Sequence, residues 1–339
     1  MGKGKQVSIK DVALRAGTSI ATVSRILNNV GYPVSDELRS RVETAIREMD
    51  YRPNRMAQTL RSKQTQSIGL IVRDISDSYF GAVAKGVTEE ASSRGLMPLV
   101  CTSKRDPKLE IEYMRILAQY QVAGVILAGA AWRDEAVRIR MKNAVKDLRL
   151  QGVRVVGCAP QETPMPCALV DNEALGRDAF HILHRQGHTR FAILSGDANN
   201  YASQLRVNGF TDEARNVGSF WTECTGAFTN LHGYNAMERV LAEYPETTAV
   251  YATNDNIAVG ALRYLEQAGK QVPTELSVLG TGDMTIASYT FPALSTMRLP
   301  YAELGAAAVK MIFEPHVRDN AVTAFPYEYI KRESVGPCR

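Results

Sequence analysis

A short N-terminal stretch, Ser8–Asn28 with the sequence SIKDVALRAGTSIATVSRILN, carries side chains that could contact the edges of DNA bases. An arginine can bond the O6 and N7 atoms of guanine together, and small apolar groups can touch the methyl group of thymine. Arg25 and the pair Ile20 and Ala21 fit these two roles. The alternative is that Arg25 contacts only phosphate or lies in solvent. The pattern favours sequence-specific DNA binding.

Two short helices joined by a tight turn would position these side chains, as in a helix-turn-helix whose second helix enters the major groove. Ser8 and Asp11 have the spacing of a capping box that would begin the first helix, and Gly17 would end it. Thr18 and Ser19 can cap the second helix. Helical spacing predicts buried apolar positions in both helices, namely Ile9, Val12, Ala13, Ala16, Val23, Ile26 and Leu27. The outer face of the second helix is then Ile20, Ala21, Ser24 and Arg25.

A third helix is predicted from Ser35, its cap, to Met49, and it would close a small three-helix core. Its inner residues are Leu38, Val42, Ala45, Ile46 and Met49. Residues 1–63 hold 12 Lys or Arg and 6 Asp or Glu, a net charge of +6, whereas the remainder holds 28 and 30, a net charge of −2. The basic end is therefore predicted to bind a polyanion, with a solvated basic face that has no partner as the alternative.

The segment after this unit could form a helix only with help from a partner. Pro53 breaks the chain, and Asn54–Arg61 (NRMAQTLR) contains good helix formers. A helix this short is marginal in water, because isolated helices below about 12 residues are not stable alone. We therefore expect this segment to order only when something packs on it.

The motifs follow one another as in the lactose/galactose repressor (LacI/GalR) family of bacterial transcriptional regulators, which the whole chain resembles. The segments that carry the resemblance, in the family's order, are IKDVALRAG, TVSRILN, YRPNRMAQTLRS, SIGLIVRDISDSYF, GVILAG, DNEALG, GHTRFAILSG, TAVYATNDNIAVGAL, VPTELSVLGTGD and PALSTMRLPYAELG. The resemblance implies a repressor that binds palindromic double-stranded operator DNA and a small polar effector, a sugar or sugar derivative. It also implies a homodimer, with a tetramer left open.

By this resemblance, two hinge helices of a dimer pair in the minor groove, and a leucine from each wedges into the central base step and bends the DNA. Leu60 occupies the wedge position, with Ala57 one turn before it. The alternative is an ordinary linker whose leucine packs against the core. The residues predicted to contact DNA are Ser8, Thr18, Ser19, Ile20, Ala21, Thr22, Ser24, Arg25, Asn28, Tyr51, Asn54, Arg55, Ala57 and Leu60.

Past Gln66, short apolar runs alternate with segments of helical periodicity, which indicates α/β structure with parallel strands covered by helices. The predicted strands are Ile68–Val72, Val122–Leu127, Val153–Gly157, Phe191–Ser195, Ala249–Ala252, Leu276–Gly280 and Phe325–Lys331. Two doubly wound lobes would follow, which resemble periplasmic sugar-binding proteins. The predicted domains are a headpiece at 1–52, a hinge at 53–66, a first lobe at 67–163 plus 297–324, and a second lobe at 164–296 plus 325–339.

A ligand is expected where the carboxyl ends of the strands of the two lobes face each other. Carboxylates and an arginine can hold ring hydroxyls, and an aromatic face can cover the apolar side of a sugar or base. The predicted effector-binding residues are Asp74, Ser76, Tyr79, Phe80, Arg206, Phe228, Asn254, Asp255 and Asp283. By resemblance, Arg206 and Asp255 match the positions that most often bind effector, with a structural salt bridge as the alternative. For Phe80 and Phe228 the alternative is packing.

The chain departs from the family pattern at Thr281–Gly282–Asp283, where an aromatic and two acidic residues are common. Having fewer carboxylates there leaves the identity of the effector open. Whether the ligand induces or corepresses is also open.

Other functions find little support. His181, His184 and His188 have no carboxylate or cysteine to complete a tetrahedral metal set, and no dinucleotide or hydrolase motif appears, so we expect no metal, no cofactor and no enzyme activity. No apolar segment of a signal peptide follows Met1–Val7, and no apolar run reaches the roughly 18 residues of a membrane span, so a cytoplasmic location without membrane contact is expected. The five cysteines are expected to be reduced thiols. The alternatives from other classes are a transport-type solute-binding protein, a DNA-processing enzyme and a nucleoid-type structural protein.

Overall fold

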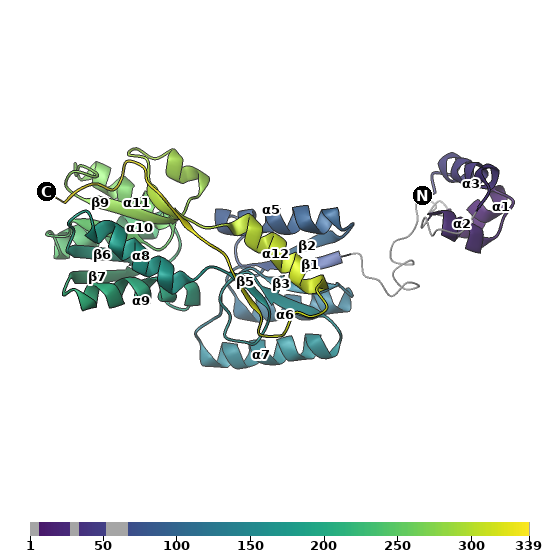
Figure 1. Cartoon of the computed structure of the whole chain (residues 1–339), viewed down its shortest axis with the longest axis horizontal. Helices are drawn as coiled ribbons and strands as arrows, with labels where there is room; N and C mark the ends of the chain where they lie inside the picture. The colour runs from purple at the N-terminus through teal and green to yellow at the C-terminus, as the bar shows by residue number, and fades with distance from the viewer. Residues whose placement is uncertain (1–6, 28–33, 52–66, 339) are drawn as a thin grey trace, which may run out of the picture. The chain divides into compact units, whose positions relative to one another are not determined.

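The computed structural model describes residues 7–27, 34–51 and 67–338 (Figure 1). The chain forms two compact units, Met1–Thr65 and Gln66–Arg339. We call the first the headpiece and the second the core. Five of the predicted DNA contacts lie outside the described residues, namely Asn28, Asn54, Arg55, Ala57 and Leu60. The predicted hinge helix lies there as well.

The headpiece contains the three predicted helices, α1 (Ile9–Arg15), α2 (Ile20–Leu27) and α3 (Asp36–Glu48). The backbone N–H and the hydroxyl of Ser8 both donate to Asp11 Oδ2, at 2.8 and 2.7 Å. Ser19 Oγ accepts from the N–H of Thr22 at 3.1 Å, and Ser35 Oγ accepts from the N–H of Leu38 at 3.4 Å. The predicted starts of all three helices are therefore confirmed, because each has a side chain that satisfies N-terminal backbone groups.

The turn between α1 and α2 is held from the third helix. Gly17 in this turn has a φ of +62°, which an L side chain rarely adopts. The Arg41 guanidinium on α3 donates from Nη2 to the carbonyls of Ala16 and Gly17 at 2.6 and 3.2 Å. The three helices bury an apolar centre made of Val12, Ala13, Ala16, Val23, Ile26, Val42 and Ala45. The angle between the two helices of the motif is thus fixed by this apolar centre and by the hydrogen bonds from Arg41.

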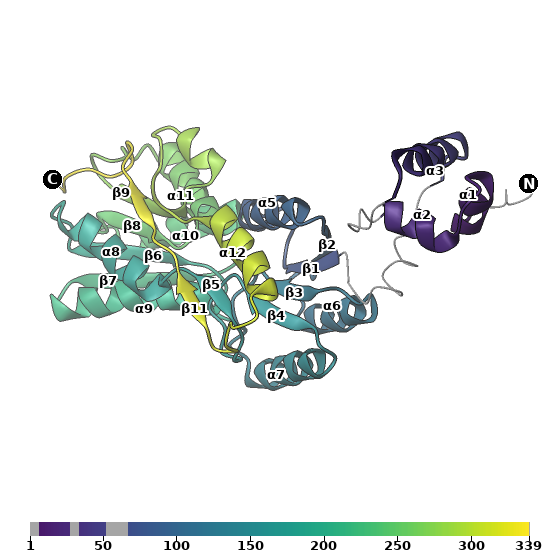
Figure 2. The same ribbon diagram turned by 45° about the vertical axis from the view of Figure 1, so that its right-hand side comes forward.

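The first lobe of the core is a six-stranded parallel sheet with helices on both faces (Figures 1 and 2). In sheet order the strands are β11 (Val322–Ala324), β5 (Cys167–Leu169), β4 (Arg154–Gly157), β3 (Gly124–Leu127), β1 (Ser67–Val72) and β2 (Met97–Thr102). One face packs on α5 (Ser78–Ser93) and α12 (Tyr301–Phe313). The other face packs on α6 (Pro107–Gln119) and α7 (Glu135–Leu150).

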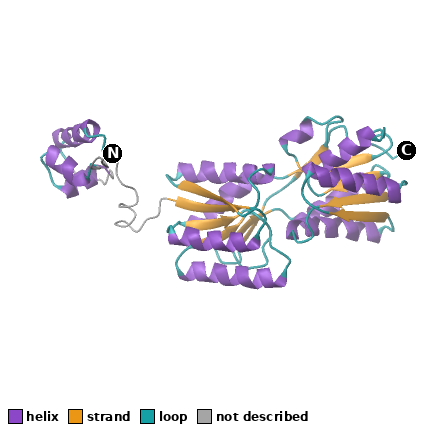
Figure 3. Ribbon diagram, turned by 180° about the vertical axis from the view of Figure 1, so that it is seen from behind, coloured by secondary structure: helices purple, strands orange, loops and turns teal. Residues whose placement is uncertain are grey.

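The second lobe repeats this plan, with one antiparallel strand at the edge of its sheet (Figure 3). In sheet order the strands are β12 (Glu328–Ile330), β10 (Ser295–Arg298), β9 (Ser277–Gly282), β8 (Ala249–Ala252), β6 (Arg190–Ser195) and β7 (Phe220–Thr225). One face packs on α8 (Asn172–His184) and α9 (Tyr201–Asn216), and the other on α10 (Asn230–Glu243) and α11 (Asp255–Gln267). A short 3-10 helix, η1 (Thr285–Ser288), follows β9. The predicted α/β class with two doubly wound lobes is confirmed.

Within residues 67–338 the chain passes between the lobes three times (Figure 1). The passages run from β5 to α8, from β10 to α12, and from β11 to β12. The predicted lobe boundaries are therefore displaced. Cys167–Leu169 belongs to the first sheet although the boundary was placed at 163, and β10 belongs wholly to the second sheet although the chain was expected to leave that lobe at 297. These strands have three and four residues, too few for an apolar run that reveals the sheet to which they belong.

Three helix pairs of the core approach each other closely through reciprocal glycines. A Cβ built on Gly176 of α8 would lie 2.0 Å from the Arg206 carbonyl oxygen, and one on Gly209 of α9 would lie 2.0 Å from the Glu173 carbonyl oxygen. The same exchange occurs between α5 and α12 and between α10 and α11, through Gly86, Gly305, Gly233 and Gly260. Any larger residue at these crossings would force the helices apart.

A separate contact, which we call the interlobe bridge, joins the loop after β3 to the loop after β6. Trp132 and Asn200 form an isolated antiparallel bridge, and the N–H of Tyr201 donates to the Ala131 carbonyl at 3.3 Å. Arg133 Nη1 donates to Gln204 Oε1 at 2.9 Å. Trp132 is anchored in the first lobe, where its indole N–H donates to Glu110 at 3.1 Å. The lobes are thus in direct contact on this side of the core.

Candidate functional site

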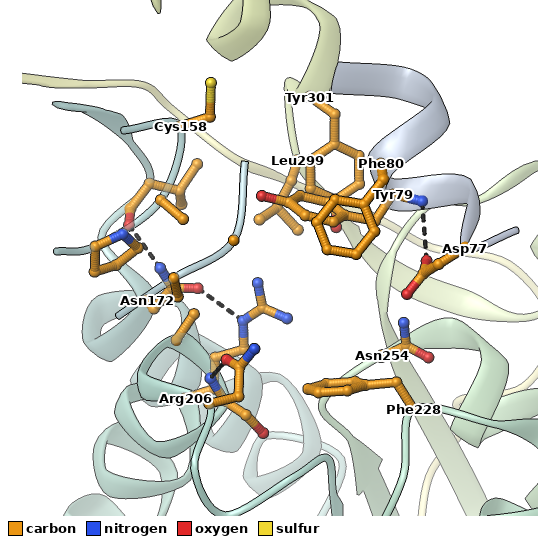
Figure 4. Close-up of a pocket in the computed structure, with 18 of the residues that line it drawn as sticks. Asp77, Tyr79, Phe80, Cys158, Asn172, Arg206, Phe228, Asn254, Leu299 and Tyr301 are labelled. Carbon is orange, nitrogen blue, oxygen red and sulfur yellow. Dashed lines mark hydrogen bonds between the residues drawn. The ribbon is translucent and has the colours of Figure 1, made fainter. Parts of the chain in front are cut away.

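A pocket lies between the two lobes of the core, where the carboxyl ends of both parallel sheets meet (Figure 4). Five of the predicted effector contacts line it, namely Tyr79, Phe80, Arg206, Phe228 and Asn254. The first lobe contributes the start of α5, and the second contributes α9, the loop after β7 and the start of α11. The structure therefore brings together residues separated by more than a hundred positions, and their role in binding remains a prediction.

Arg206 projects from α9 toward the centre of the pocket, as Figure 4 shows. Its Nε donates to Asn172 Oδ1 at 2.8 Å, and its Nη1 donates to the Thr253 carbonyl at 2.6 Å. Asn172 is itself held, because its Nδ2 donates to the Val170 carbonyl at 2.9 Å. Two of the three guanidinium nitrogens are thus fixed by the protein. The remaining nitrogen, Nη2, takes part in neither of these bonds, and Arg206 also interacts with the Tyr301 hydroxyl at the pocket wall.

Aromatic rings form two opposite walls of the pocket. Phe80 is buried, and its ring lies 4.7 Å from the ring of Tyr79, which in turn lies 4.8 Å from the ring of Tyr301. Phe228 lies across the pocket from them (Figure 4). Its ring occupies space left free by Gly196, where a Cβ would come within 2.1 Å of it. A flat, partly apolar ligand would fit between such faces.

Asp77 and Arg105 also line the pocket, and neither is among the predicted effector contacts. Asp77 caps α5 by accepting from the N–H of Tyr79 at 3.1 Å, and it pairs with Arg105 Nη2 at 3.1 Å. Burial raises the pKa of the Asp77 carboxyl, although the Tyr79 N–H and Arg105 oppose this. Asp77 could have been predicted from the sequence, because aspartate is a common N-cap residue before a helix. Arg105 could not, because it follows β2, a strand that was not predicted.

Three further polar side chains of the pocket were missed, Asn172, Asn200 and Ser203. Asn200 caps α9, with its Oδ1 accepting from the N–H of Ser203 at 3.0 Å. Asparagine at a helix N-cap is common for structural reasons alone, so this position gives no signal of a ligand. Only the meeting of α8, α9 and β8 shows that these side chains share one pocket.

Asp74 and Ser76 lie farther out, in a second pocket that adjoins the first. The Ser76 hydroxyl and N–H donate to Asp74 Oδ1 at 2.6 and 3.0 Å, which closes a local turn. The Ser76 hydroxyl lowers the pKa of Asp74. Asp197 lines this outer pocket as well. The mouth of the cleft is therefore richer in carboxylates than its interior.

Asp255 and Asp283, predicted to bind effector, line neither pocket. Asp255 is completely buried, and its oxygens accept from the Thr296 hydroxyl at 2.6 Å and the Met284 N–H at 2.7 Å. The predicted alternative of a salt bridge between Arg206 and Asp255 is wrong too, because Arg206 bonds Asn172 and Thr253 instead.

Asp283 adopts a φ of +52°, and its two oxygens accept from Arg298 at 2.7 Å and Arg332 at 2.6 Å. Both aspartates hold the strand ends of the second lobe together. Because they bond within the second lobe and line neither pocket, the structure does not bring them together with the other predicted effector contacts.

In the headpiece, several predicted DNA contacts lie on the surface of the described helices. Ser8, Ser19, Ala21 and Arg25 are exposed, whereas Thr18, Thr22, Ser24 and Tyr51 are half-buried. Ile20 was placed on the outer face, but it is half-buried and packs against the apolar centre of the headpiece. Its availability to a thymine methyl is therefore smaller than the helical spacing indicated.

Residues 65–333 match the family described as periplasmic binding proteins and sugar binding domain of LacI family. Residues 8–54, which include all three headpiece helices, match the bacterial regulatory proteins of the lacI family. The chain belongs to the LacI family. It is thus a LacI-family transcriptional regulator with a DNA-binding headpiece, and a solute-binding protein without a DNA role is not favoured.

Relatives within the LacI family cover almost the whole chain. The transcriptional regulator GalS of Salmonella typhimurium is 32% identical over 97% of this chain and 96% of its own length. The regulator DegA of Bacillus subtilis is 31% identical, covering 89% of each chain. The ribose operon repressor of Escherichia coli is 29% identical over 90% of this chain and 92% of its own. These relatives are named as regulators rather than as enzymes.

Solved structures of the LacI family share the fold. The lac repressor dimer bound to operator and the anti-inducer ONPF has a TM-score of 0.89 at 24% identity, over 98% of this chain and all of that one. The complex of the regulator CelR with cellobiose has a TM-score of 0.70 at 25% identity, over 97% of this chain and 99% of that one. The two-lobed LacI-family core described above agrees with both.

No helix among the described residues is both long and apolar enough to cross a membrane. No three His, Cys, Asp or Glu side chains in the same ranges are arranged to hold a metal. The buried His188 instead bonds Thr248 and Ser277, each at 3.0 Å, and burial lowers its pKa.

Proposed function

We propose that the chain is a cytoplasmic, operator-binding repressor, without enzyme activity, whose DNA affinity is set by a small polar effector between the core lobes. The names of its relatives support this, since they include a ribose operon repressor, and the names of the solved structures include a lac repressor bound to operator and a regulator bound to cellobiose. A partly apolar pocket with a few fixed polar groups supports the effector role.

The observation that carries the DNA role is the geometry of α2. Its inner residues Val23 and Ile26 are buried against α1 and α3, and Ala21 and Arg25 are exposed on the same helix. Because Ser19 caps this helix and Arg41 holds the preceding turn, the exposed face has a fixed direction. We assign Arg25 to a guanine in the major groove of each half-site.

Effector control requires that the ligand favour one arrangement of the lobes over the other, because equal affinity for both would shift nothing. An inducer would favour the arrangement that separates the hinge segments and withdraws Leu60 from the minor groove, so that affinity falls toward the non-specific phosphate contribution. A corepressor would have the opposite effect. A ligand that lowers operator affinity is then an inducer, and one that raises it is a corepressor.

The operator is proposed to be a palindrome bound by a homodimer, with a tetramer as the alternative assembly. A twofold protein requires two half-sites related by the same symmetry. The lac repressor, whose fold this chain shares, is described as a dimer on its operator.

The test is a fluorescence-anisotropy titration of the full chain, at fixed salt, on a palindromic duplex selected from a random pool. Arg25→Ala is expected to weaken binding by about 1–3 kcal/mol and to relax the preference at one base position per half-site, as loss of a bidentate guanine contact would. Arg47→Ala is the control, because Arg47 is an exposed arginine on α3 of the same headpiece.

An unchanged base preference in Arg25→Ala would assign this arginine to the phosphate backbone instead. A wild-type chain that binds every duplex equally, with or without effector, would contradict the proposed function itself.

A further inference from the structure

We call the first pocket between the lobes, which contains Arg206, the inner pocket. Its charged groups are two guanidinium groups, Arg105 and Arg206, and one carboxylate, Asp77. Asp77 is already paired with Arg105 at 3.1 Å and accepts a backbone N–H with its other oxygen. The inner pocket therefore has one positive charge, on Arg206, that no lining carboxylate balances. A neutral polyol would leave this charge uncompensated, whereas an anion would balance it.

The neutral polar groups of the pocket show the same bias toward donors. The carboxamide oxygens of Asn172, Asn200 and Asn254 already accept from Arg206 Nε, from the Ser203 N–H and from the Ile257 N–H. These three partners can only donate, so the orientation of each carboxamide is fixed. With its oxygen turned toward the Ile257 N–H, Asn254 presents its NH₂ group on the pocket side (Figure 4).

The Tyr301 hydroxyl also lines the pocket, and as a protonated phenol it can donate to a ligand as well as accept. The end of the Arg206 guanidinium points into the same space (Figure 4). The acceptor-rich carboxylates expected from the sequence are elsewhere: Asp255 and Asp283 are bonded within the second lobe, and Asp74 lies in the outer pocket.

Resting on the proposed function, we infer that the effector is a carboxylate-bearing sugar derivative, a sugar acid rather than a neutral sugar. Its carboxylate meets Arg206 Nη2 and the Asn254 NH₂ group. Its carbon skeleton lies between Phe80 and Phe228, and its remaining hydroxyls face the outer pocket, where Asp74 and Asp197 can accept from them.

The first test is calorimetric titration of the full chain with matched pairs: D-gluconate and D-glucuronate against D-glucose, D-galacturonate against D-galactose, and D-ribonate against D-ribose. At least one acid is expected to bind ten or more times tighter than its neutral partner. Glucose 6-phosphate and ribose 5-phosphate form a separate arm. If no acid binds, or if a neutral sugar binds as tightly as its acid, the inference is wrong; binding of the phosphates alone would replace the carboxylate with a phosphate.

The second test replaces one neutral donor of the pocket with a negatively charged acceptor while keeping the N-cap of α11. In Asn254→Asp one oxygen can still accept from the Ile257 N–H and cap α11, because aspartate is also a favoured N-cap. The other oxygen replaces the NH₂ group that faces the pocket. The affinity for the acid is expected to fall more than tenfold, with the unfolding temperature unchanged; an unchanged affinity would contradict the inference.

Arg206→Gln is expected to lower the affinity for the acid by a similar factor. Arg215→Gln is its matched control, because Arg215 lies on the same helix and is exposed. The anisotropy titration keeps the two proposals apart. Relief of operator binding by a neutral sugar would leave the proposed function intact and overturn this inference. Tight binding of an acid with no effect on operator affinity would support the pocket chemistry inferred here and contradict the proposed effector control.

Discussion

Asp255 is a completely buried carboxyl, and burial raises its pKa to about 6 from a usual value of 3.8. The hydrogen bonds from Thr296 and Met284 oppose this rise without cancelling it. A raised pKa means that the folded protein holds this proton more tightly than the unfolded chain. The contribution to stability is therefore largest below about pH 4, declines as the pH rises toward 6, and stays constant above it.

Asp255→Asn should remove this decline, because the carboxamide is neutral at every pH. Its oxygen can accept from Met284, and its NH₂ group can donate to the Thr296 hydroxyl. Between pH 4 and 7 the free energy of unfolding of the variant, relative to the wild type, should improve by on the order of 2 kcal/mol. Denaturant unfolding at both pH values measures this. Asp212→Asn, on the exposed face of α9, serves as the control; parallel pH profiles for Asp255→Asn and the wild type would contradict the prediction.

The sequence could place Asp255 and Asp283 after strand ends but could not predict which way their side chains point. That direction depends on distant partners, Thr296 for the first and Arg332 for the second. Arg206 was predicted from the family motif and does line the pocket. Arg105 was missed because its position depends on Asp77, which lies 28 residues earlier in the chain.

At the scale of elements, the close crossing of α8 and α9 fixes where Arg206 leaves its helix. Gly176→Ala would place a methyl group 2.0 Å from the Arg206 carbonyl oxygen, so the two helices must separate. Overpacking of this kind typically costs about 1–3 kcal/mol. We expect the free energy of unfolding to fall by that amount and the affinity for effector to fall with it.

Gly81→Ala is the matched control, because Gly81 lies in α5 and a Cβ there meets nothing within 4 Å. Replacing glycine with alanine inside an exposed helix should instead stabilise it, by up to about 1 kcal/mol. Thermal unfolding of both variants makes the comparison, and equal shifts in the two would show that the α8–α9 crossing can relax without loss.

Most interior strands were predictable, and so was the edge strand β12, which lies within the predicted Phe325–Lys331; the short interior strands β5 and β10 and the edge strands β2, β7 and β11 were not. β1, β3, β4, β6, β8 and β9 all coincide with predicted apolar runs. β2 and β7 each lie at one edge of their sheet and are partly exposed. Thr222 and Glu223 of β7, for example, interrupt the apolar run that would indicate a strand. Strand order itself follows from helix crossovers and sheet pairing, which a single sequence does not contain.

At the scale of the molecule, the interlobe bridge connects the two walls of the pocket. Its backbone bonds join Ala131 to Tyr201 and Arg133 to Asn199, both at 3.3 Å, and the Arg133 side chain reaches Gln204. Trp132, at the centre of the bridge, is anchored to Glu110. Loosening this contact should therefore favour lobe separation without altering any side chain that lines the inner pocket.

Arg133→Ala removes the side-chain bond to Gln204, which is worth about 1 kcal/mol. Amide hydrogen exchange of the segments around 131–134 and 199–202 should become roughly three to ten times faster, since exchange follows the free energy of local opening. Mass spectrometry of the free protein measures this. Arg140→Ala, an exposed arginine on α7, is the control. Unchanged protection in both segments would mean that the backbone bonds alone hold the bridge.

The three passages between the lobes restrict how the core can move. Two bodies joined by one linker can twist about any axis, whereas three segments that cross the same border favour bending about a line through the points where they cross (Figure 1). This bending is then the motion that the connectivity of the core favours. Chemically different molecules that close the pocket would drive the same rotation of the lobes. The connectivity of the chain then sets the direction of that rotation, and the ligand sets only its amplitude.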